Sequence, residues 1–160
     1  MAFATWKDAV DRFRRYVGDI PQLNTLDKEI ENTDDEITDY IKDAMIEINS
    51  NYEPRTGWSL AEIIVEPNDP GQIAWSTVKL GALLQMLTSK GVLSARNAIT
   101  YSDAGGVTVS EMDKWGRYIN YFNTLANKYE RSVLQAKMRF NIQQAYGGTA
   151  SPMGYDYYYG

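Results

Sequence analysis

Cysteine and histidine are both absent from this chain of 160 residues. Without cysteine there can be no disulfide framework, no thiolate nucleophile and no thiolate metal ligand. Without histidine the chain lacks the commonest metal ligand and the one side chain that titrates near neutrality unperturbed. Hydrolysis by the usual serine–histidine pair is therefore excluded, and we expect a protein that is not an enzyme and has no cofactor or metal.

Long apolar runs are missing too. No stretch approaches the roughly 20 residues of a membrane span, and no secretory signal follows the N-terminus, so we expect no membrane partner. The net charge of -5 argues against non-specific nucleic-acid binding by the surface as a whole. With 44% hydrophobic and 23% charged residues, the chain has the composition of an ordinary globular domain.

Residues 110–146 show a regular spacing of apolar side chains. Apolar or aromatic side chains recur there at steps of three and four, which predicts a single long helix from Ser110 to about Tyr146. At about 1.5 Å per residue this helix would be roughly 55 Å long, too long to be buried along its length in a domain of this size. Part of it must therefore face solvent or another protein chain.

The N-terminal helix is bounded by clear signals. Thr5 is a suitable N-cap and Gly18 a natural stop, which predicts a helix over residues 6–17. Its three arginines are expected on a solvated face, with a patch for an acidic partner as the alternative: Arg12, Arg14 and Arg15.

A capping box of Thr33 and Glu36 predicts a second helix over residues 34–51. Its first turns are rich in carboxylates that suit the positive end of the helix dipole: Asp34, Asp35, Glu36 and Asp39. Paired carboxylates can perform acid–base chemistry or hold a divalent cation. Their polar neighbours and the lack of an EF-hand loop favour a solvated, structural role.

Residues 52–100 are predicted to contain one more helix. The segment 60–65 is interpreted as a short strand, with a helical turn as the alternative. Asp69 as cap and Pro70 at the first position then predict a mostly buried helix that ends at Lys90, where Gly91 closes it. Gly81 and Ala82 would let a neighbouring helix approach closely. The fold class is thus mainly α, a small helical bundle over residues 1–146.

The last segment, 147–160, is an extended tail rich in glycine and tyrosine that cannot build a core of its own. We expect it to dock on a partner through Tyr146, Met153, Tyr155, Tyr157, Tyr158 and Tyr159. The glycine pair Gly105 and Gly106 lacks the Lys-Ser/Thr of a phosphate loop and predicts a tight turn before the long helix.

Charge is distributed unevenly along the chain. Residues 27–53 hold ten acidic and two basic side chains, a balance of -8, whereas residues 110–146 hold six basic and three acidic ones, a balance of +3. This asymmetry indicates electrostatic pairing between elements or between subunits. The long helix could alternatively bind single-stranded nucleic acid through its aromatic and basic side chains: Trp115, Tyr118, Tyr121, Phe122, Tyr129 and Phe140, with Arg117, Lys128, Arg131, Lys137 and Arg139.

Two stretches carry a family resemblance. The run Tyr101-Ser-Asp-Ala-Gly-Gly-Val-Thr-Val-Ser110, followed by a long helix ending in Phe140-Asn-Ile-Gln-Gln-Ala-Tyr-Gly-Gly148, resembles neck proteins of tailed bacteriophages. More particularly, it is similar to the head-to-tail adaptor or connector proteins that sit under the portal. The resemblance covers about the last 60 residues; the first 100 agree only in the general order of their elements.

The resemblance implies a helical structural protein of the virion, at the head–tail interface, which resides in the host cytoplasm during assembly. Such proteins form a ring, usually of twelve copies, that binds the portal protein on one side and tail or further neck proteins on the other. Genomic DNA passes through the central channel, and a C-terminal extension contacts the portal. No residue in this family is catalytic.

For such a ring we predict subunit contacts through Asp103, Gly105, Gly106, Asp35, Asp39, Arg131 and Lys137. A cyclic ring joins different patches of each subunit, so the acidic helix could meet the basic helix of the next copy. Alternatively, the acidic helix lines the channel, where its carboxylates would repel DNA and ease its passage.

Overall fold

Four helices and a very small sheet make up the described part of the chain. The computed structural model describes residues 3, 5–20, 30–51, 53–67, 69, 71–97 and 112–146, with 91–97, 112–118 and 146 described as backbone only. The helices in these ranges are α1 (Trp6–Val17), α2 (Asp34–Asn51), α3 (Trp75–Asn97) and α4 (Met112–Tyr146). A short 3-10 helix, η1 (Leu60–Glu62), precedes strands β1 (Ile63–Ile64) and β2 (Ile73–Ala74). The mainly helical fold and its long C-terminal helix are confirmed.

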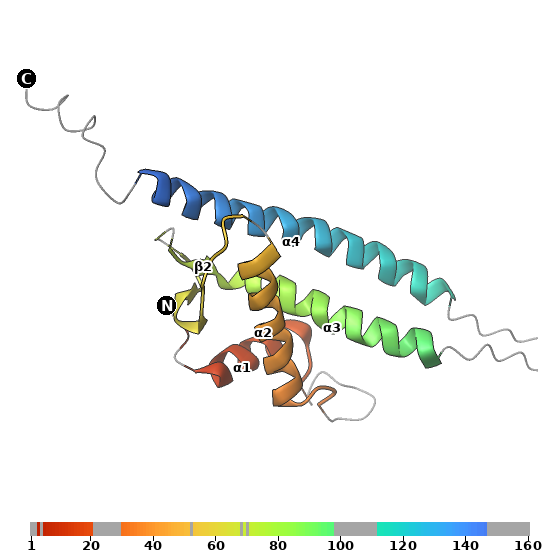
Figure 1. Cartoon of the computed structure of the whole chain (residues 1–160). Coiled ribbons are helices and arrows are strands. Elements are labelled where there is room, and N and C mark those ends of the chain that lie inside the picture. The colour runs from red at the N-terminus through yellow and green to blue at the C-terminus, as the bar shows by residue number, and fades with distance from the viewer. Residues whose placement is uncertain are drawn as a thin grey trace, which may run out of the picture.

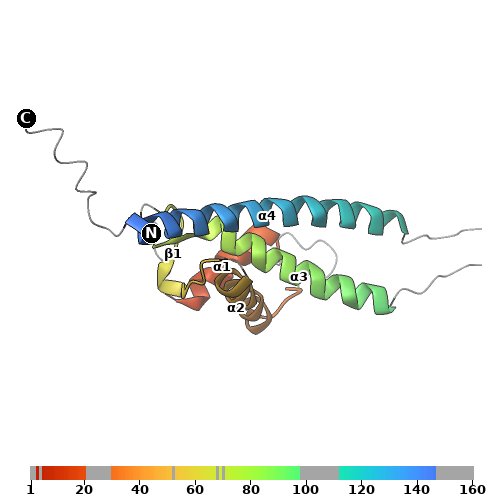
Figure 2. The same cartoon turned by 45° about the horizontal axis from the view of Figure 1, so that its top comes forward.

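Helix α3 is the centre of the bundle. It runs side by side with α4 in the opposite direction, while α2 crosses it and α1 packs beside α2 (Figures 1 and 2). The apolar faces of these elements meet in one core, whose fully buried members include Phe13, Ile37, Ile41, Ile48, Ile63, Ile73, Val78 and Val133. Because this core occupies only one side of α2 and of α4, each of these helices also has an outward side.

Local capping signals predicted α1 and α2 correctly. The Thr5 hydroxyl accepts a hydrogen bond from the Asp8 amide, and α1 ends at Gly18, whose φ of 76° is left-handed. At α2, the Glu36 carboxylate accepts from the Thr33 amide at 2.7 Å while the Thr33 hydroxyl accepts from the Glu36 amide. These two hydrogen bonds form the predicted capping box. The hydrogen bonds that the Thr33 amide and the Thr33 hydroxyl donate to the Glu36 carboxylate lower the pKa of that carboxyl.

The start and end of α3 differ from the prediction. Asp69 accepts the amide of Gly71 on its side chain and that of Gln72 on its carbonyl, so it belongs to a turn and not to a helix cap. The residues after this turn form β2, which pairs in parallel with β1, and the helix begins only at Trp75. At the other end α3 continues through Gly91 to Asn97, since one glycine costs a helix only about 1 kcal/mol.

The segment 60–65 contains both of the conformations that the sequence left open. Ser59 caps η1 with a capping box to Glu62, and the chain then extends into β1. Ile63 faces Ile73 and Ile64 faces Ala74 across the two strands. Because Ile63 and Ile73 are fully buried, this small sheet closes one end of the core.

Gly81 lies where α2, α3 and α4 come closest. A Cβ atom placed there would stand 2.9 Å from the Ala44 Cβ of α2 and 2.8 Å from the Tyr129 ring of α4. Both distances are shorter than carbon atoms tolerate without displacement. The predicted role of Gly81 in close helix approach is therefore confirmed.

We expect Gly81→Ala to lower the free energy of unfolding. Overpacking a core site costs about 1–3 kcal/mol, which outweighs the roughly 1 kcal/mol that alanine gains in helix propensity. Urea unfolding measures the difference. Gly57→Ala is the matched control, because a Cβ there meets nothing within 4 Å. Equal stability of the two variants would contradict the close crossing at Gly81.

Candidate interaction surface

The outward side of α4 carries an apolar strip that nothing in the described chain covers. Leu134, Met138 and Ile142 follow one another at steps of four and are 44%, 63% and 52% exposed. On the opposite side of the helix, Leu125, Tyr129 and Val133 are buried against the core. A helix that is apolar on both sides has a second surface to bury. We call Leu134, Met138 and Ile142 the outer strip.

Three basic side chains and one acidic side chain, Glu130, are exposed on α4 near the outer strip. Lys128, Arg131 and Arg139 are exposed on α4, and none of them belongs to the ion pairs found among the described residues. The outward side of α4 therefore combines an apolar strip with positive charges that lack an acidic partner in the described part of the chain. Arg131, for which the sequence predicts a subunit contact, is exposed.

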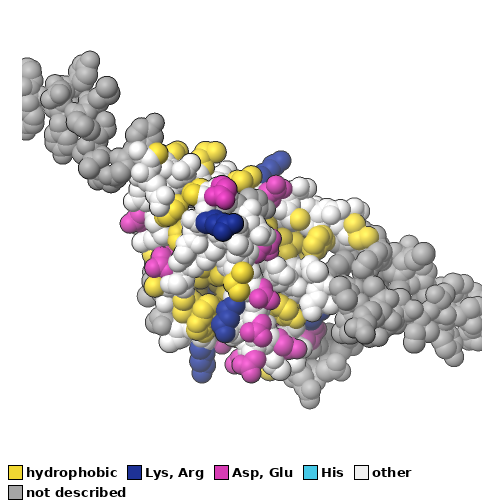
Figure 3. Space-filling model, viewed as in Figure 1, with side chains coloured by type: hydrophobic (Ala, Val, Ile, Leu, Met, Phe, Trp, Pro, Cys, Tyr) yellow, Lys and Arg dark blue, Asp and Glu magenta, His cyan; other side chains and the backbone are white. Residues whose placement is uncertain are grey.

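The outward side of α2 has the opposite charge. Asp35, Asp39, Asp43 and Glu47 recur at steps of four along it and form what we call the acidic ridge. Asp35, Asp39 and Asp43 are exposed and Glu47 is half-buried; across the described ranges none of the four belongs to an ion pair. Figure 3 shows acidic side chains gathered along α2. Ile46 lies beside the ridge and is 64% exposed, the largest exposure among the apolar side chains of α2.

The two surfaces lie on different helices, and no ion pair joins them among the described residues. Both α2 and α4 turn their buried sides toward the core around α3 (Figures 1 and 2). Pairing of the basic side of one molecule with the acidic side of another would join two different patches. Contact between two different patches is heterologous, the kind that generates rings or open filaments.

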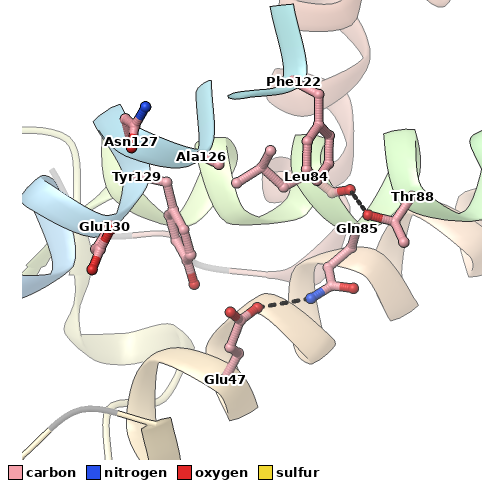
Figure 4. Close-up of a pocket in the computed structure, with 9 residues that line it drawn as sticks. All are labelled: Glu47, Leu84, Gln85, Thr88, Phe122, Ala126, Asn127, Tyr129 and Glu130. Carbon is pink, nitrogen blue, oxygen red and sulfur yellow. Dashed lines mark hydrogen bonds between the residues drawn. The ribbon is translucent and has the colours of Figure 1, made fainter. Parts of the chain in front are cut away.

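A groove lies at the junction of α2, α3 and α4. Its volume is about 280 Å³. Figure 4 shows Glu47 of α2, Glu130 of α4, and the α3 side chains Leu84, Gln85 and Thr88 around it. The remaining lining residues all come from α4: Phe122, Ala126, Asn127 and Tyr129. The groove thus has an apolar floor, two carboxylates and no basic side chain.

The sequence predicted Lys137 at a subunit interface, but its side chain lies inside the molecule. It is 1% exposed, and its Nζ donates to the Pro54 carbonyl at 2.8 Å and to the Asn49 carbonyl at 3.3 Å. It also lies 5.5 Å from the centre of the Trp58 ring. Burial lowers the pKa of Lys137, and the charge of Glu53 partly opposes this. Lys137 therefore binds one of the last carbonyls of α2, where a cation is favourable.

Arg14 also departs from its expected place on a solvated face. It is 7% exposed and donates to Asp19 at 3.0 Å and to Asp34 at 2.7 Å. Asp19 in turn accepts from the Glu31 amide and from the amide and side chain of Asn32. These contacts fix the end of α1 to the start of α2, so Arg14 is an internal link and unavailable to an outside partner. Arg12 and Arg15 are exposed as predicted.

The pKa of the Asp19 carboxyl depends on both its burial and its hydrogen-bond and charge partners. Burial acts to raise its pKa, but the hydrogen bonds from Asn32 and Glu31 and the charge of Arg14 together lower it below its ordinary value.

The carboxylates at the start of α2 have separate roles: Asp34 binds Arg14 and Glu36 caps the helix, while Asp35 and Asp39 face solvent. No group of three or more potential metal ligands occurs among the described residues.

The aromatic face predicted for nucleic-acid stacking is largely occupied by the core. Tyr129 is 4% exposed, and Phe122 and Phe140 pack against the core. Tyr121 is 54% exposed and is the accessible member among those whose side chains are described. The side chains of Trp115, Tyr118 and Arg117 lie outside that set.

Several predicted contact residues lie outside the described residues. They are Asp103, Gly105 and Gly106 before α4, and Met153, Tyr155, Tyr157, Tyr158 and Tyr159 after it; Tyr146 is described by its backbone alone, as the last residue of α4. The outer strip and the groove were not singled out by the sequence analysis. A search for apolar residues on the side opposite the main apolar period would have found the outer strip.

Comparison of the chain with protein-family models, curated proteins and solved structures gives no match. Among the described helices, none is both long enough and apolar enough to cross a membrane.

Proposed function

We propose that this chain is a structural protein that assembles head to tail with copies of itself. The carrying observation is the outer strip of α4, an exposed apolar surface with three basic side chains near it that have no acidic partners in the described chain. The acidic ridge of α2 is its electrostatic complement, with Ile46 as an apolar contact. Charge complementarity of this kind fixes the orientation of a contact, while apolar burial supplies its free energy.

The biological setting that we propose is the neck of a tailed bacteriophage. It rests on the resemblance of residues 101–110 and 140–148 to head-to-tail adaptors. In that setting the assembly is a closed ring between the portal protein and the tail or further neck proteins, with DNA passing through its channel. The segment 147–160 would contact the portal. A heterologous contact between α4 and α2 suits such a ring, because closure of the rotation makes a ring of identical contacts.

We expect Leu134→Asp combined with Met138→Asp to abolish self-assembly. Each aspartate would place an unpaired charge in the middle of the apolar contact, which desolvation strongly disfavours. Sedimentation velocity should then show a species of 18.2 kDa, the mass of one chain. Val65→Asp is the matched control, since Val65 is an exposed apolar residue outside both surfaces. Assembly by the double variant at the concentration of the wild type would contradict the proposal.

A second candidate function, binding of single-stranded nucleic acid, is favoured by one observation. Lys128, Arg131 and Arg139 are accessible along α4, together with the exposed ring of Tyr121. If these side chains bind phosphates, the affinity for an oligonucleotide falls steeply with salt and is lost in Arg131→Glu. If they bind the acidic ridge of a neighbouring copy, Arg131→Glu weakens self-assembly instead. The two measurements separate the candidates.

A further inference from the structure

We propose that the groove between α2, α3 and α4 receives an arginine side chain from the outward side of α4 of a second copy. This inference rests on the proposed self-assembly and identifies the site at which one copy recognises the next. It makes the groove a receptor for a guanidinium group and Arg131 or Arg139 its ligand.

Two polar groups of the groove already donate to the protein itself. The Gln85 side-chain amide donates to the Glu47 carboxylate at 2.8 Å, and the Thr88 hydroxyl donates to the Leu84 carbonyl at 2.8 Å (Figure 4). The second oxygen of Glu47 remains as an acceptor, and Glu130 adds a second carboxylate at the edge of the groove, on the other side of Tyr129 (Figure 4). Guanidinium has five N–H donors and no acceptor, and it binds carboxylates well.

The floor of the groove suits the rest of an arginine side chain. Leu84, Phe122 and Ala126 line it, so the methylene stem would contact apolar atoms while the charged end reaches the carboxylates. The Phe122 ring adds a surface that attracts a cation. The volume of about 280 Å³ lies at the lower end of the roughly 300–1,000 Å³ of small-molecule sites and is sufficient for a single long side chain.

Continuity with the acidic ridge indicates a second copy as the source. Glu47 is the last member of the ridge and also lines the groove, so a molecule that binds the ridge reaches the groove too. The outward side of α4 presents Arg131 and Arg139 beside the outer strip, and neither belongs to an ion pair among the described residues. If α4 of a neighbouring copy packed its outer strip on Ile46, these arginines would lie close to Glu47.

Charge reversal tests the assignment in the full-length chain. We expect Glu47→Arg and Glu130→Arg each to weaken self-assembly by about tenfold or more, as loss of a close charge pair does at other interfaces. Glu130→Arg is the cleaner variant, because Glu130 makes no hydrogen bond or ion pair found among the described residues. Glu66→Arg reverses an exposed acidic residue away from the groove and is the control. Thermal unfolding verifies that each variant folds.

Rescue identifies the ligand. Adding Arg131→Glu or Arg139→Glu to the chain that carries both Glu47→Arg and Glu130→Arg should restore assembly in at least one case, because each contact then regains opposite charges. If the wild type assembles and Glu130→Arg assembles equally well, the inference about the groove is overturned, whereas the proposed self-assembly is not. Weakened assembly that neither swap restores would also overturn it. A wild type that stays monomeric would instead refute the proposed function itself.

Discussion

Arg14→Ala is expected to lower the free energy of unfolding by about 3–5 kcal/mol, the usual consequence of removing one partner from a buried ion pair. The Arg14 and Asp19 side chains are 9% and 5% exposed, and the N–O distance between them is 3.0 Å. Without the guanidinium, the Asp19 carboxylate stays buried with no cation beside it. The bond to Asp34 contributes less, since that side chain is 67% exposed and water screens it. Because small domains are stable by only about 5–15 kcal/mol, this loss would be severe.

Urea unfolding at a fixed protein concentration measures this effect, because self-assembly makes the apparent stability depend on concentration. The matched control is Arg15→Ala, the exposed neighbour on the same helix, for which we expect a change within about 0.5 kcal/mol. Equal losses for the two variants would show that the link between α1 and α2 is not formed in solution.

The pH dependence of the free energy of unfolding is an independent test of the contact between Arg14 and Asp19. The pKa of Asp19 is lowered in the folded protein, so its stabilising contribution is present above the unfolded value of about 3.9 and is lost as the pH falls through the folded pKa. Arg14→Ala removes one cause of the lowering. The variant should therefore gain less stability from Asp19, and the loss of this contribution on acidification should be complete at a higher pH than in the wild type.

The second large effect is expected for Lys137→Ala, which should lower the free energy of unfolding by about 2–4 kcal/mol. The substitution removes the donor from the Pro54 carbonyl, and an unsatisfied polar group away from water costs about 1–3 kcal/mol. The Asn49 carbonyl also loses the ammonium group but keeps the hydrogen bond from the Thr56 amide. It also removes a methylene stem that is buried beside Trp58. The desolvation that lowers the pKa of Lys137 opposes part of this loss, because the ammonium group itself resists burial.

Two comparison variants separate these contributions. Lys137→Met keeps most of the buried stem but not the donor, so we expect it to be destabilised less than Lys137→Ala. Arg139→Ala removes an exposed cation two residues away and should change the stability by no more than about 0.5 kcal/mol. If Lys137→Ala unfolded at the same urea concentration as Arg139→Ala, Lys137 would belong on the surface, where the sequence had placed it.

The helices whose ends depend on neighbouring residues were the predictable part of the fold. Thr5 and Gly18 bound α1, and Thr33 with Glu36 starts α2, because capping hydrogen bonds join residues three or four apart. The start of α3 was missed because Ile73 pairs with Ile63, ten residues earlier, and this pairing outweighs the local preference of Asp69 and Pro70 for a helix start.

The buried charges show the limit of sequence reasoning at the candidate site. Arg14 and Lys137 each follow a buried valine by four residues, at the border of the apolar face of their helix. The burial of these charges depends on acceptors from distant parts of the chain, such as Asp34 and Pro54. Asp35, Asp39 and Arg131 are exposed because nothing in the described chain covers them, and their place at a subunit contact stays a prediction. The groove could not be predicted, since Glu47 and Glu130 are brought together only by the packing of α2 and α4 on α3.

The mass of the wild-type protein in solution tests self-assembly most directly. We predict that native mass spectrometry at low ionic strength shows a discrete species at a multiple of 18.2 kDa, and that raising the salt to about 1 M, where the screening length falls to about 3 Å, shifts the population toward smaller species. A single species of one chain mass at micromolar concentration, at low and at high salt alike, would contradict the account.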